Sequence, residues 1–356
     1  MNKKFISLLI LPLMFTVSSC DKGQTNPSKE YFSLWNIEKS SSLRLLKEYV
    51  EDVTNEDSDN FIPVEDRIAT FDMDGTFIGE LYPTYFEYNL LEYRVFEDES
   101  YKDIAPEDVR EAAQTIRNYS RGYISKFPSG FDMIHARAAA KAYSGMSLSE
   151  FDTFVKEYAS QDANGFENMT YGQSFYKPML EIFDYLADYQ FTSYVVSGSD
   201  RYICRALVDS IGIAPNRVIG MDVVIKSSGQ GDQDGVTYTM ESDEYLIRTD
   251  ELIIKNLKTN KVKQISQEIG KVPVLSFGNS SGDEAMHNYC KGNPDYRSEV
   301  FMLIADDEDE DHVNMEETRS RKEKWEENNY NIISMANDFK TIYGYDVVKT
   351  DFHFDD

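Results

Sequence analysis

The feature that most constrains this chain is a pair of aspartates at the end of a short apolar run. Residues 67–70 and Phe71 predict a buried strand, and Asp72 and Asp74 follow it directly, ahead of the Gly75-Thr76 turn. In an open α/β sheet, ligands bind at this carboxyl end of a strand. Two carboxylates this close repel each other unless a cation lies between them or they share a proton. The motif therefore predicts a metal-assisted site with an Asp nucleophile and an Asp acid/base, against the alternative of a solvated turn.

Length and charge limit the classes of function. With 356 residues, 41% of them hydrophobic, the chain can hold one large domain or two modest ones around a sizeable core. The net charge of −27 argues against a nucleic-acid partner, because no basic surplus is present to neutralise phosphates. The same acidity repels a free phosphate ester at long range, so a site for one needs a local cation.

The first 20 residues read as an export signal. Lys3 and Lys4 precede an apolar stretch, residues 5–17, that is too short for a stable membrane anchor. Val17-Ser18-Ser19-Cys20 resembles the bacterial lipobox, where cleavage precedes a lipidated Cys. We therefore expect a signal peptide at 1–19, a lipidated tether at 20–40, and a membrane partner contacted through the lipid anchor of Cys20 in the bacterial cell envelope. The alternative is an ordinary secretory signal with an incidental Cys.

The rest of the chain divides into strand-rich and helix-rich parts. Residues 78–190 are rich in helix signals, including an alanine-rich pattern at 133–143 and a capping box formed by Ser147 and Glu150. Strands are predicted on the far side of this segment, at 192–196, 217–225, 235–240, 245–254, 272–277 and 301–304, with 235–240 and 245–254 forming a hairpin. This order predicts an α/β fold with a mostly parallel sheet, in which 41–77 and 191–356 form the core and 78–190 form a helical cap.

Cysteine and histidine usage excludes two kinds of site. Beyond Cys20, only Cys204 and Cys290 remain, and both lie in predicted helices as buried small hydrophobes, so no disulfide framework is expected. The histidines lack the spacing of a zinc site; they are His135, His287, His312 and His353.

Polar residues also follow two of the later strands. Ser197 and Gly198 come after the strand at 192–196, and Asn279 and Asp283 follow the strand at 272–277. With the DxDGT motif, these segments make the chain resemble the haloacid dehalogenase-like (HAD) superfamily over nearly all residues after 40. The phosphoserine-phosphatase-like members, with a helical cap after the first motif, are the most similar in pattern.

The resemblance implies a role for each motif residue. Asp72 attacks phosphorus, Asp74 acts first as acid and then as base, and Ser197 with Gly198 holds a phosphate oxygen. The family's lysine opens a helix. Among Lys255, Lys258, Lys261 and Lys263 we choose Lys261, because Ile265 and Ile269 follow it at helical spacing.

A hard divalent cation with oxygen ligands suits Mg²⁺. We expect Asp72, Asp283 and the backbone carbonyl of Asp74 to supply the protein ligands. Asn279 stands where many family members have Asp, and its part in metal binding is left open.

Three weaker features have a plainer alternative. Glu80, just after the first motif, is a candidate substrate contact or a solvated loop residue. Arg201 is expected to form an ion pair on its helix rather than to bind substrate. The acidic run at 306–311 lacks EF-hand spacing and is expected to be a solvated loop.

These residues together predict an exported, Mg²⁺-dependent phosphatase that acts on a small phosphomonoester through an aspartyl-phosphate. A phosphotransferase of the same superfamily is one alternative. A catalytically silent lipoprotein that keeps the fold for binding is another. The identity of the ester is not encoded in any motif that we recognise.

Overall fold

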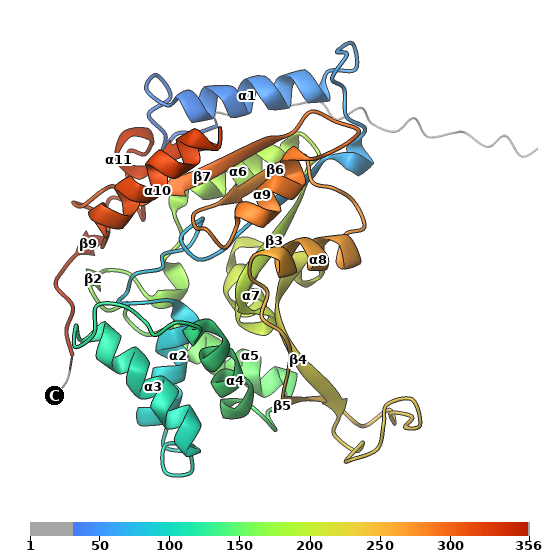
Figure 1. The fold of residues 1–356 in the computed structure, drawn as a ribbon, viewed down its shortest axis with the longest axis vertical. Helices are drawn as coiled ribbons and strands as arrows, with labels where there is room; N and C mark the ends of the chain where they lie inside the picture. Colours follow the sequence, from blue (N-terminus) through green and yellow to red (C-terminus); the bar gives the residue numbers. More distant parts are fainter. Residues whose placement is uncertain (1–30, 355–356) are drawn as a thin grey trace, which may run out of the picture.

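A mostly parallel seven-stranded sheet forms the centre of the molecule. The computed structural model describes residues 31–354. The strand order is β5-β4-β3-β1-β6-β7-β8, and every neighbouring pair is parallel except β4 and β5 (Figure 1). The strands are β1 (Ile68–Phe71), β3 (Thr192–Asp200), β4 (Val218–Ser227), β5 (Leu246–Ile254), β6 (Leu275–Gly278), β7 (Glu299–Ile304) and β8 (Asn331–Ser334). The predicted α/β class with a mostly parallel sheet is confirmed.

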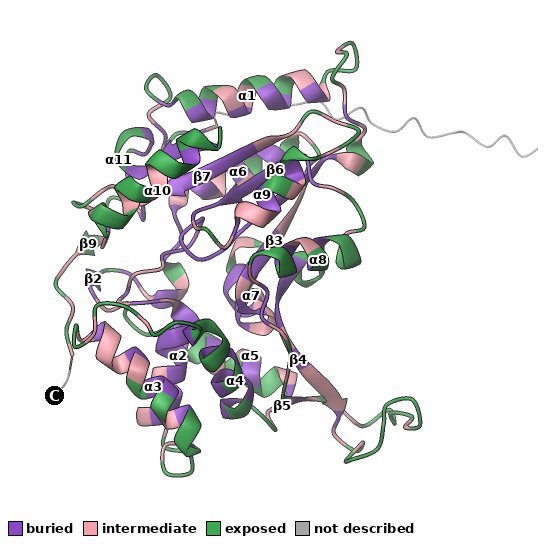
Figure 2. Cartoon of the chain, in the orientation of Figure 1, coloured by how far each residue is buried: buried purple, intermediate pink, exposed green. Residues whose placement is uncertain are grey.

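Helices cover both faces of this sheet. One face packs against α1 (Ser41–Thr54), α6 (Lys177–Asp188) and α7 (Arg201–Val208) in a single large apolar cluster. The other face packs against α8 (Thr259–Glu268), α9 (Glu284–Lys291) and α10 (Met315–Glu327) in two smaller clusters. The central strands are buried on both faces (Figure 2). Burial on both faces explains why these strands read as short continuous apolar runs in the sequence.

A row of phenylalanine rings aligns the central strands. Phe71, Phe277 and Phe301 are register partners on β1, β6 and β7. The Phe71 and Phe277 rings stack at 4.4 Å, and the Phe277 and Phe301 rings at 5.0 Å. Phe183 of α6 covers Phe71 at 4.1 Å. Because Phe71 is the last residue of β1 and Phe277 lies one residue before the end of β6, the loops that follow both strands start at the same edge of the sheet.

Four helices form a cap beside the carboxyl ends of the strands (Figure 1). They are α2 (Phe86–Phe96), α3 (Glu107–Ser120), α4 (Phe131–Ala142) and α5 (Leu148–Ala159). Both halves of the capping box between Ser147 and Glu150 are present at the start of α5. The predicted cap segment, 78–190, ends too late, because α6 buries its apolar face in the main cluster against β3.

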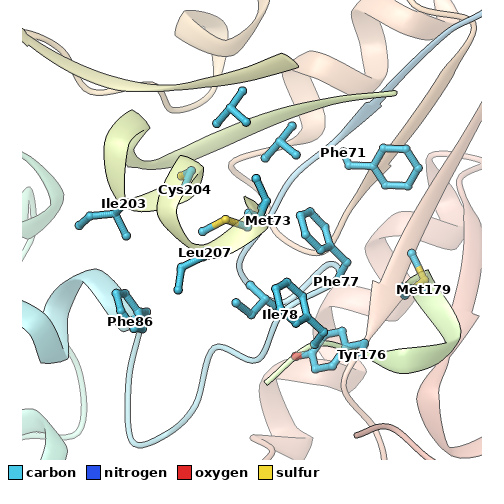
Figure 3. Close-up of a cluster of buried hydrophobic side chains, with 14 of the residues drawn as sticks. Phe71, Met73, Phe77, Ile78, Phe86, Tyr176, Met179, Ile203, Cys204 and Leu207 are labelled. Atoms are coloured by element: carbon cyan, nitrogen blue, oxygen red, sulfur yellow. The ribbon is translucent and has the colours of Figure 1, made fainter. Parts of the chain in front are cut away.

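Apolar side chains join the cap to the core. Figure 3 shows Phe86 of α2 near Ile203 and Leu207 of α7, with Met73 and Ile78 of the loop after β1 close by. All of these side chains belong to one buried cluster. A second junction lies at the chain's end, where β9 (Val348–Lys349) pairs antiparallel with β2 (Phe166–Glu167).

The hairpin is formed by different residues from those predicted. β5 pairs with β4, whereas 235–240 forms no strand. Its alternating apolar residues are not buried, since Val236 is 93% exposed and Met240 45% exposed. β8 was missed, as was the short helix α11 (Met335–Asp338) after it, because the four residues of β8 offer no alternating pattern.

The N-terminal prediction is partly corrected. Residues 31–40, expected to be tether, pack on the core: Phe32 and Trp35 are buried, and the Trp35 indole donates to the Pro178 carbonyl at 2.9 Å. The predicted signal peptide and Cys20 lie outside the described residues. Between residues 31 and 354, none of the helices has both the length and the apolar character needed to span a bilayer.

The acidic run at 306–311 is not the solvated loop that was expected. Asp306 accepts hydrogen bonds from the Ser334 hydroxyl and the Ala336 amide at the start of α11. Asp311 is buried, and its Oδ1 accepts from the Tyr343 hydroxyl at 3.0 Å and from the His312 amide at 2.9 Å. Burial raises the pKa of Asp311 to about 7. The carboxylates of this run therefore bind the C-terminal segment to the core.

The raised pKa of Asp311 makes stability depend on pH. Between its ordinary value of 3.8 and about 7, the native protein keeps a proton that the unfolded chain releases, so stability falls as pH rises through this window. Asp311→Asn keeps the accepting Oδ1 and removes the charge. At pH 8 we expect the free energy of unfolding of the variant to exceed that of the wild type by about 1–4 kcal/mol. At pH 4 we expect no such gain. Urea unfolding at both pH values measures the difference. The exposed Asp309→Asn is the control, and a gain that is equal at both pH values would contradict the argument.

Candidate active site

A lysine ammonium holds together two carboxylates from different strand ends. Asp72 follows β1, and its amide donates to the Phe277 carbonyl on β6 at 2.9 Å. The Lys261 Nζ donates to Asp72 Oδ1 at 2.5 Å and to Asp283 Oδ1 at 2.6 Å. All three side chains are buried. Lys261, chosen from four lysines on helical spacing, is therefore the one that reaches both aspartates.

The two aspartates differ in their remaining contacts. Burial, and then the charge of Asp283, raise the pKa of Asp72 to about 7. Burial opposes ionisation of Asp283 as well, but Lys261 and the Ser280 amide hold its pKa below the ordinary value. Asp283 Oδ2 accepts from the amides of Asn279 at 3.1 Å and Ser280 at 3.0 Å. Lys261 and the backbone amides thus favour the ionised form of Asp283, whereas burial and the charge of Asp283 oppose ionisation of Asp72.

The turn after Asp74 requires glycine. Gly75 has a φ of +75°, and a Cβ there would come within 1.9 Å of the Asn279 amide nitrogen and 2.6 Å of a Glu80 carboxylate oxygen. Asn279 donates to that Glu80 oxygen at 3.1 Å. The close approach brings the loops after β1 and β6 together across Gly75.

Asp74 is bound mainly by a serine that sequence reasoning did not single out. The Ser199 hydroxyl donates to Asp74 Oδ2 at 2.7 Å, whereas the Ser197 hydroxyl is 3.5 Å from the same oxygen. Ser197 is fully buried, and its Oγ accepts from the Ser199 amide at 3.0 Å. Asp74 Oδ1 is buried and has no hydrogen-bond partner among residues 31–354, and burial raises the pKa of Asp74 to about 7. Ser199 and Gly198 line the cavity, whereas Ser197 does not. The contact between Ser197 and a phosphate oxygen stays a prediction.

A second buried charge network, also missed, connects the cap to the core. Glu87 of α2 accepts from Lys255 Nζ at 2.6 Å and from the Asp200 amide at 3.1 Å. Asp200 in turn pairs with Arg248 of β5 at 2.6 Å. Arg248 exchanges backbone hydrogen bonds with the cap loop, donating to Met146 and accepting from Gly145, both at 2.9 Å. No motif marks these residues, because each pair joins segments far apart in the sequence.

The carboxylates and lysines surround one small cavity of about 80 Å³. Its wall includes more acidic than basic side chains: Asp72, Asp74, Glu80, Glu87, Asp132 and Asp283 against Lys255 and Lys261. Lys261 and Lys255 are already paired, and no ion pair among the described residues includes Asp74 or Glu80. Burial, opposed by the charge of Arg321, raises the pKa of Glu80 to about 7. Glu80 therefore lies at the site rather than in a solvated loop.

This donor set fits a hard divalent cation. Oxygen ligands are available from Asp72, Asp283, the Asp74 carbonyl and water, and the excess of carboxylates favours a cation. No group of three or more His, Cys, Asp or Glu side chains in the described part of the chain is arranged to bind a metal. A Mg²⁺ ion here would thus use two carboxylates and complete its shell with backbone, substrate and water oxygens. The Asn279 amide oxygen accepts from Thr76 at 3.5 Å, and its part in metal binding stays open.

The remaining candidates lie outside the cavity. Arg201 pairs with Asp222 at 2.6 Å and with Glu268 at 2.5 Å, as the ion-pair alternative expected. Cys204 and Cys290 are free and buried. His287 is buried on α9, where its Nδ1 lies 2.7 Å from the Ser276 hydroxyl.

Comparisons with known proteins agree with the fold. No protein-family model matches the chain, and no curated protein matches it. A solved structure of a conserved, functionally unknown protein from Anaerococcus prevotii is similar, with 14% identity over 92% of this chain and 99% of that one and a TM-score of 0.51. Its likeness supports the fold, an α/β core with a mostly parallel sheet.

Two similar structures are proteins with hydrolase names. A phosphoserine phosphohydrolase-like protein from Francisella tularensis is 13% identical over 67% of this chain and 87% of that one, with a TM-score of 0.38. A cytosolic 5′-nucleotidase IIIB bound to cytidine is 14% identical over 83% and 85%, with a TM-score of 0.46.

The Glu87–Lys255 pair gives a test of how the cap is held. Removing one member of a buried ion pair leaves the other charge uncompensated, at a cost of about 3–5 kcal/mol. We expect Lys255→Met to lower the free energy of unfolding by that amount, and Glu87→Gln added to it to recover part of the loss. The half-exposed Lys156, paired with Asp152 at 3.1 Å, is the control, and Lys156→Met should cost less than about 1 kcal/mol. Urea unfolding measures all three, and a double variant no more stable than Lys255→Met would show that the pair is not coupled.

Proposed function

We propose that this protein is a Mg²⁺-dependent phosphomonoester hydrolase of the HAD type, with Asp72 as nucleophile. The proposal rests on the Lys261 ammonium, which donates hydrogen bonds to both Asp72 and Asp283. The nearby Asp74 has one buried oxygen, Oδ1, that accepts no hydrogen bond from the described residues. An ammonium and two buried carboxylates at a strand edge form a site for a dianion only when a further cation is bound. Mg²⁺, when present, neutralises the nucleophile and the phosphate so that they can approach.

The cavity residues have distinct parts in binding. The Lys261 ammonium and the backbone at Gly198 line the cavity with Asp72 and can donate to equatorial phosphate oxygens, while the Ser199 hydroxyl donates to Asp74. Asp283 keeps Lys261 charged and in place. Because these side chains are buried, their charges interact more strongly than they would in bulk water.

The chemistry has two steps. In the first, an Asp72 carboxylate oxygen bonds to phosphorus and the bond from phosphorus to the ester oxygen breaks, while Asp74 gives its proton to the leaving oxygen. In the second, Asp74 takes a proton from water, the water oxygen bonds to phosphorus, and the bond to Asp72 breaks, which releases phosphate and restores both carboxyl groups. A pKa of about 7 lets Asp74 serve as acid and then as base near neutral pH.

Loss of the nucleophile tests the proposal. Asp72→Asn keeps the size of the side chain but cannot form the acyl phosphate, so we expect kcat on a chromogenic aryl phosphate to fall by more than tenfold, equivalent to about 1.4 kcal/mol in the barrier. The exposed Asp250→Asn is the matched control and should keep wild-type kcat. Wild-type activity should also disappear with a chelator and return with Mg²⁺. Retention of more than a tenth of kcat by a folded Asp72→Asn protein would rule out this nucleophile.

Asp74 is tested separately, through the intermediate. Asp74→Asn removes the titrating proton, so kcat should fall by roughly 10²–10⁴-fold. An activated aryl phosphate needs little protonation of its leaving group, so the first step should survive better than the second. Phosphate should then accumulate on Asp72, which acid quench and mass spectrometry can detect. Undiminished turnover of activated and unactivated esters alike, with no phosphoenzyme, would show that Asp74 is not the acid/base.

The two alternatives differ from hydrolysis in measurable ways. A phosphotransferase would form a phosphorylated acceptor when a second alcohol is added, at the expense of free phosphate. A silent binding protein would release no phosphate from any ester. The carboxylates and Lys261 converging on one cavity favour an active site over silent binding.

We also propose that the protein is held at a membrane of the bacterial cell envelope through lipidated Cys20. The support is the Val17-Ser18-Ser19-Cys20 sequence after a short apolar stretch. Cys20→Ser should release the protein from membranes or leave its precursor uncleaved, as seen by fractionation and intact mass. A variant that fractionates and migrates like the wild type would contradict the anchor.

A further inference from the structure

A larger cleft continues from the small cavity over Asp72. It has a volume of about 610 Å³, within the range of roughly 300–1,000 Å³ that is typical of small-molecule sites. Glu80, Tyr85 and Asn279 line both the cavity and the cleft. The cleft is therefore the place where the part of a substrate beyond its phosphate would lie.

Aromatic rings of the cap form one wall of this cleft. Phe127 stacks on Phe131 at 4.6 Å with ring planes 8° apart, and Tyr119 stacks on Phe127 at 4.2 Å. Tyr119 and Phe127 line the cleft and are half-buried. Tyr119 ends the stack, because it has no second ring neighbour among residues 31–354. Since Tyr119 lines the cleft, a flat ring bound there can extend the stack.

The charges that line the cleft cancel. Its basic side chains are Lys126, Arg321 and Lys349, and its acidic ones are Glu80, Glu308 and Glu317. Arg321 is paired with Glu317, and Lys349 donates to the backbone carbonyls of Glu308 and Asp311. Burial keeps the pKa of His312 below its usual value, so this side chain is neutral. No cation surplus is present for a second phosphate or a carboxylate on the leaving group.

Tyr85 provides a polar contact where cavity and cleft meet. Its hydroxyl has no hydrogen-bond partner within the described residues, and its ring packs against Tyr88 at 5.3 Å. The neighbouring Glu80 carboxylate raises the pKa of Tyr85, so the hydroxyl stays a donor. It is placed to bind a hydroxyl or ether oxygen of the alcohol near the phosphate.

We propose that the leaving group of the substrate is an uncharged alcohol of about nucleoside size that bears an aromatic ring, stacked on Tyr119 and bound by the Tyr85 hydroxyl. This assignment rests on the proposed phosphatase function and names its substrate class. Stacking of a base on an aromatic side chain typically contributes a preference of roughly 5- to 100-fold.

The test compares esters that differ only in the ring. Adenosine 5′-monophosphate and uridine 5′-monophosphate are compared with ribose 5-phosphate, which has the same primary phosphate and sugar without a base. Benzyl phosphate is compared with cyclohexylmethyl phosphate, which has a saturated ring of similar size. We expect kcat/KM to favour the aromatic member of each pair at least fivefold. If only the nucleotides are preferred over ribose 5-phosphate, the site recognises a nucleoside. If benzyl phosphate is also preferred over cyclohexylmethyl phosphate to the same degree, the aromatic ring itself is the feature recognised.

Variants locate the preference in the cleft. Tyr119→Leu should lower the ratio of kcat/KM for adenosine 5′-monophosphate over ribose 5-phosphate at least fivefold. Tyr123→Leu is the matched control, because Tyr123 lies four residues away in the loop after α3, is 76% exposed and does not line the cleft. Tyr85→Phe should raise the KM for the nucleotide more than it lowers kcat. If Tyr119→Leu leaves the ratio of the two kcat/KM values unchanged, Tyr119 has no stacking role, whatever the result for Tyr123→Leu.

The outcomes separate this inference from the function on which it rests. If ribose 5-phosphate and cyclohexylmethyl phosphate are hydrolysed as well as their aromatic counterparts, the phosphatase proposal stands and the substrate class is wrong. If no ester is hydrolysed, adenosine alone is titrated into the protein by calorimetry. Binding that Tyr119→Leu weakens supports the cleft and overturns the phosphatase, whereas no binding overturns both.

Discussion

The buried ammonium of Lys261 between Asp72 and Asp283 is the interaction on which the site depends. Burying any one of these charges alone would be costly, and the group is tolerated because each oxygen facing Lys261 accepts a bond from it. The three residues come from the loop after β1, from α8 and from the loop after β6. The trio therefore fixes the relative positions of these segments at the point where the strand order reverses direction, which is where an open α/β sheet places its ligands.

The positions of Asp72 and Asp283 can be predicted from the sequence because both residues follow the end of a strand. A short apolar run followed by polar residues is visible without homologues, and parallel neighbours bring such ends to the same edge of the sheet. Helical spacing after Lys261 was enough to choose it from four lysines, since Ile265 is buried on the same helix.

The parts that could not be predicted depend on contacts between distant segments. Glu87 and Lys255 are 168 residues apart, and neither position differs from an ordinary surface charge in its local pattern. The sequence pattern of α6 is that of a cap helix, but its apolar face packs on the sheet, where Phe183 stacks on Phe71. Residues 235–240 have strand-like composition, but strand propensity is decided by what a face packs against, and Val236 packs against nothing. Ser199 rather than Ser197 binds Asp74 because β3 extends to Asp200, beyond the end predicted for it.

The core and the cap contribute different kinds of residue to the site. Around Asp72, the core supplies both lysines and most of the carboxylates to a cavity of about 80 Å³, and the cap adds Glu87 and Asp132. Farther out, the cap supplies rings and neutral polar groups to a cleft several times larger. The two regions meet at Glu80 and Tyr85, next to the Glu87–Lys255 pair that joins α2 to the core. A change in the cap can therefore reshape the cleft while the charged groups around Asp72 keep their positions.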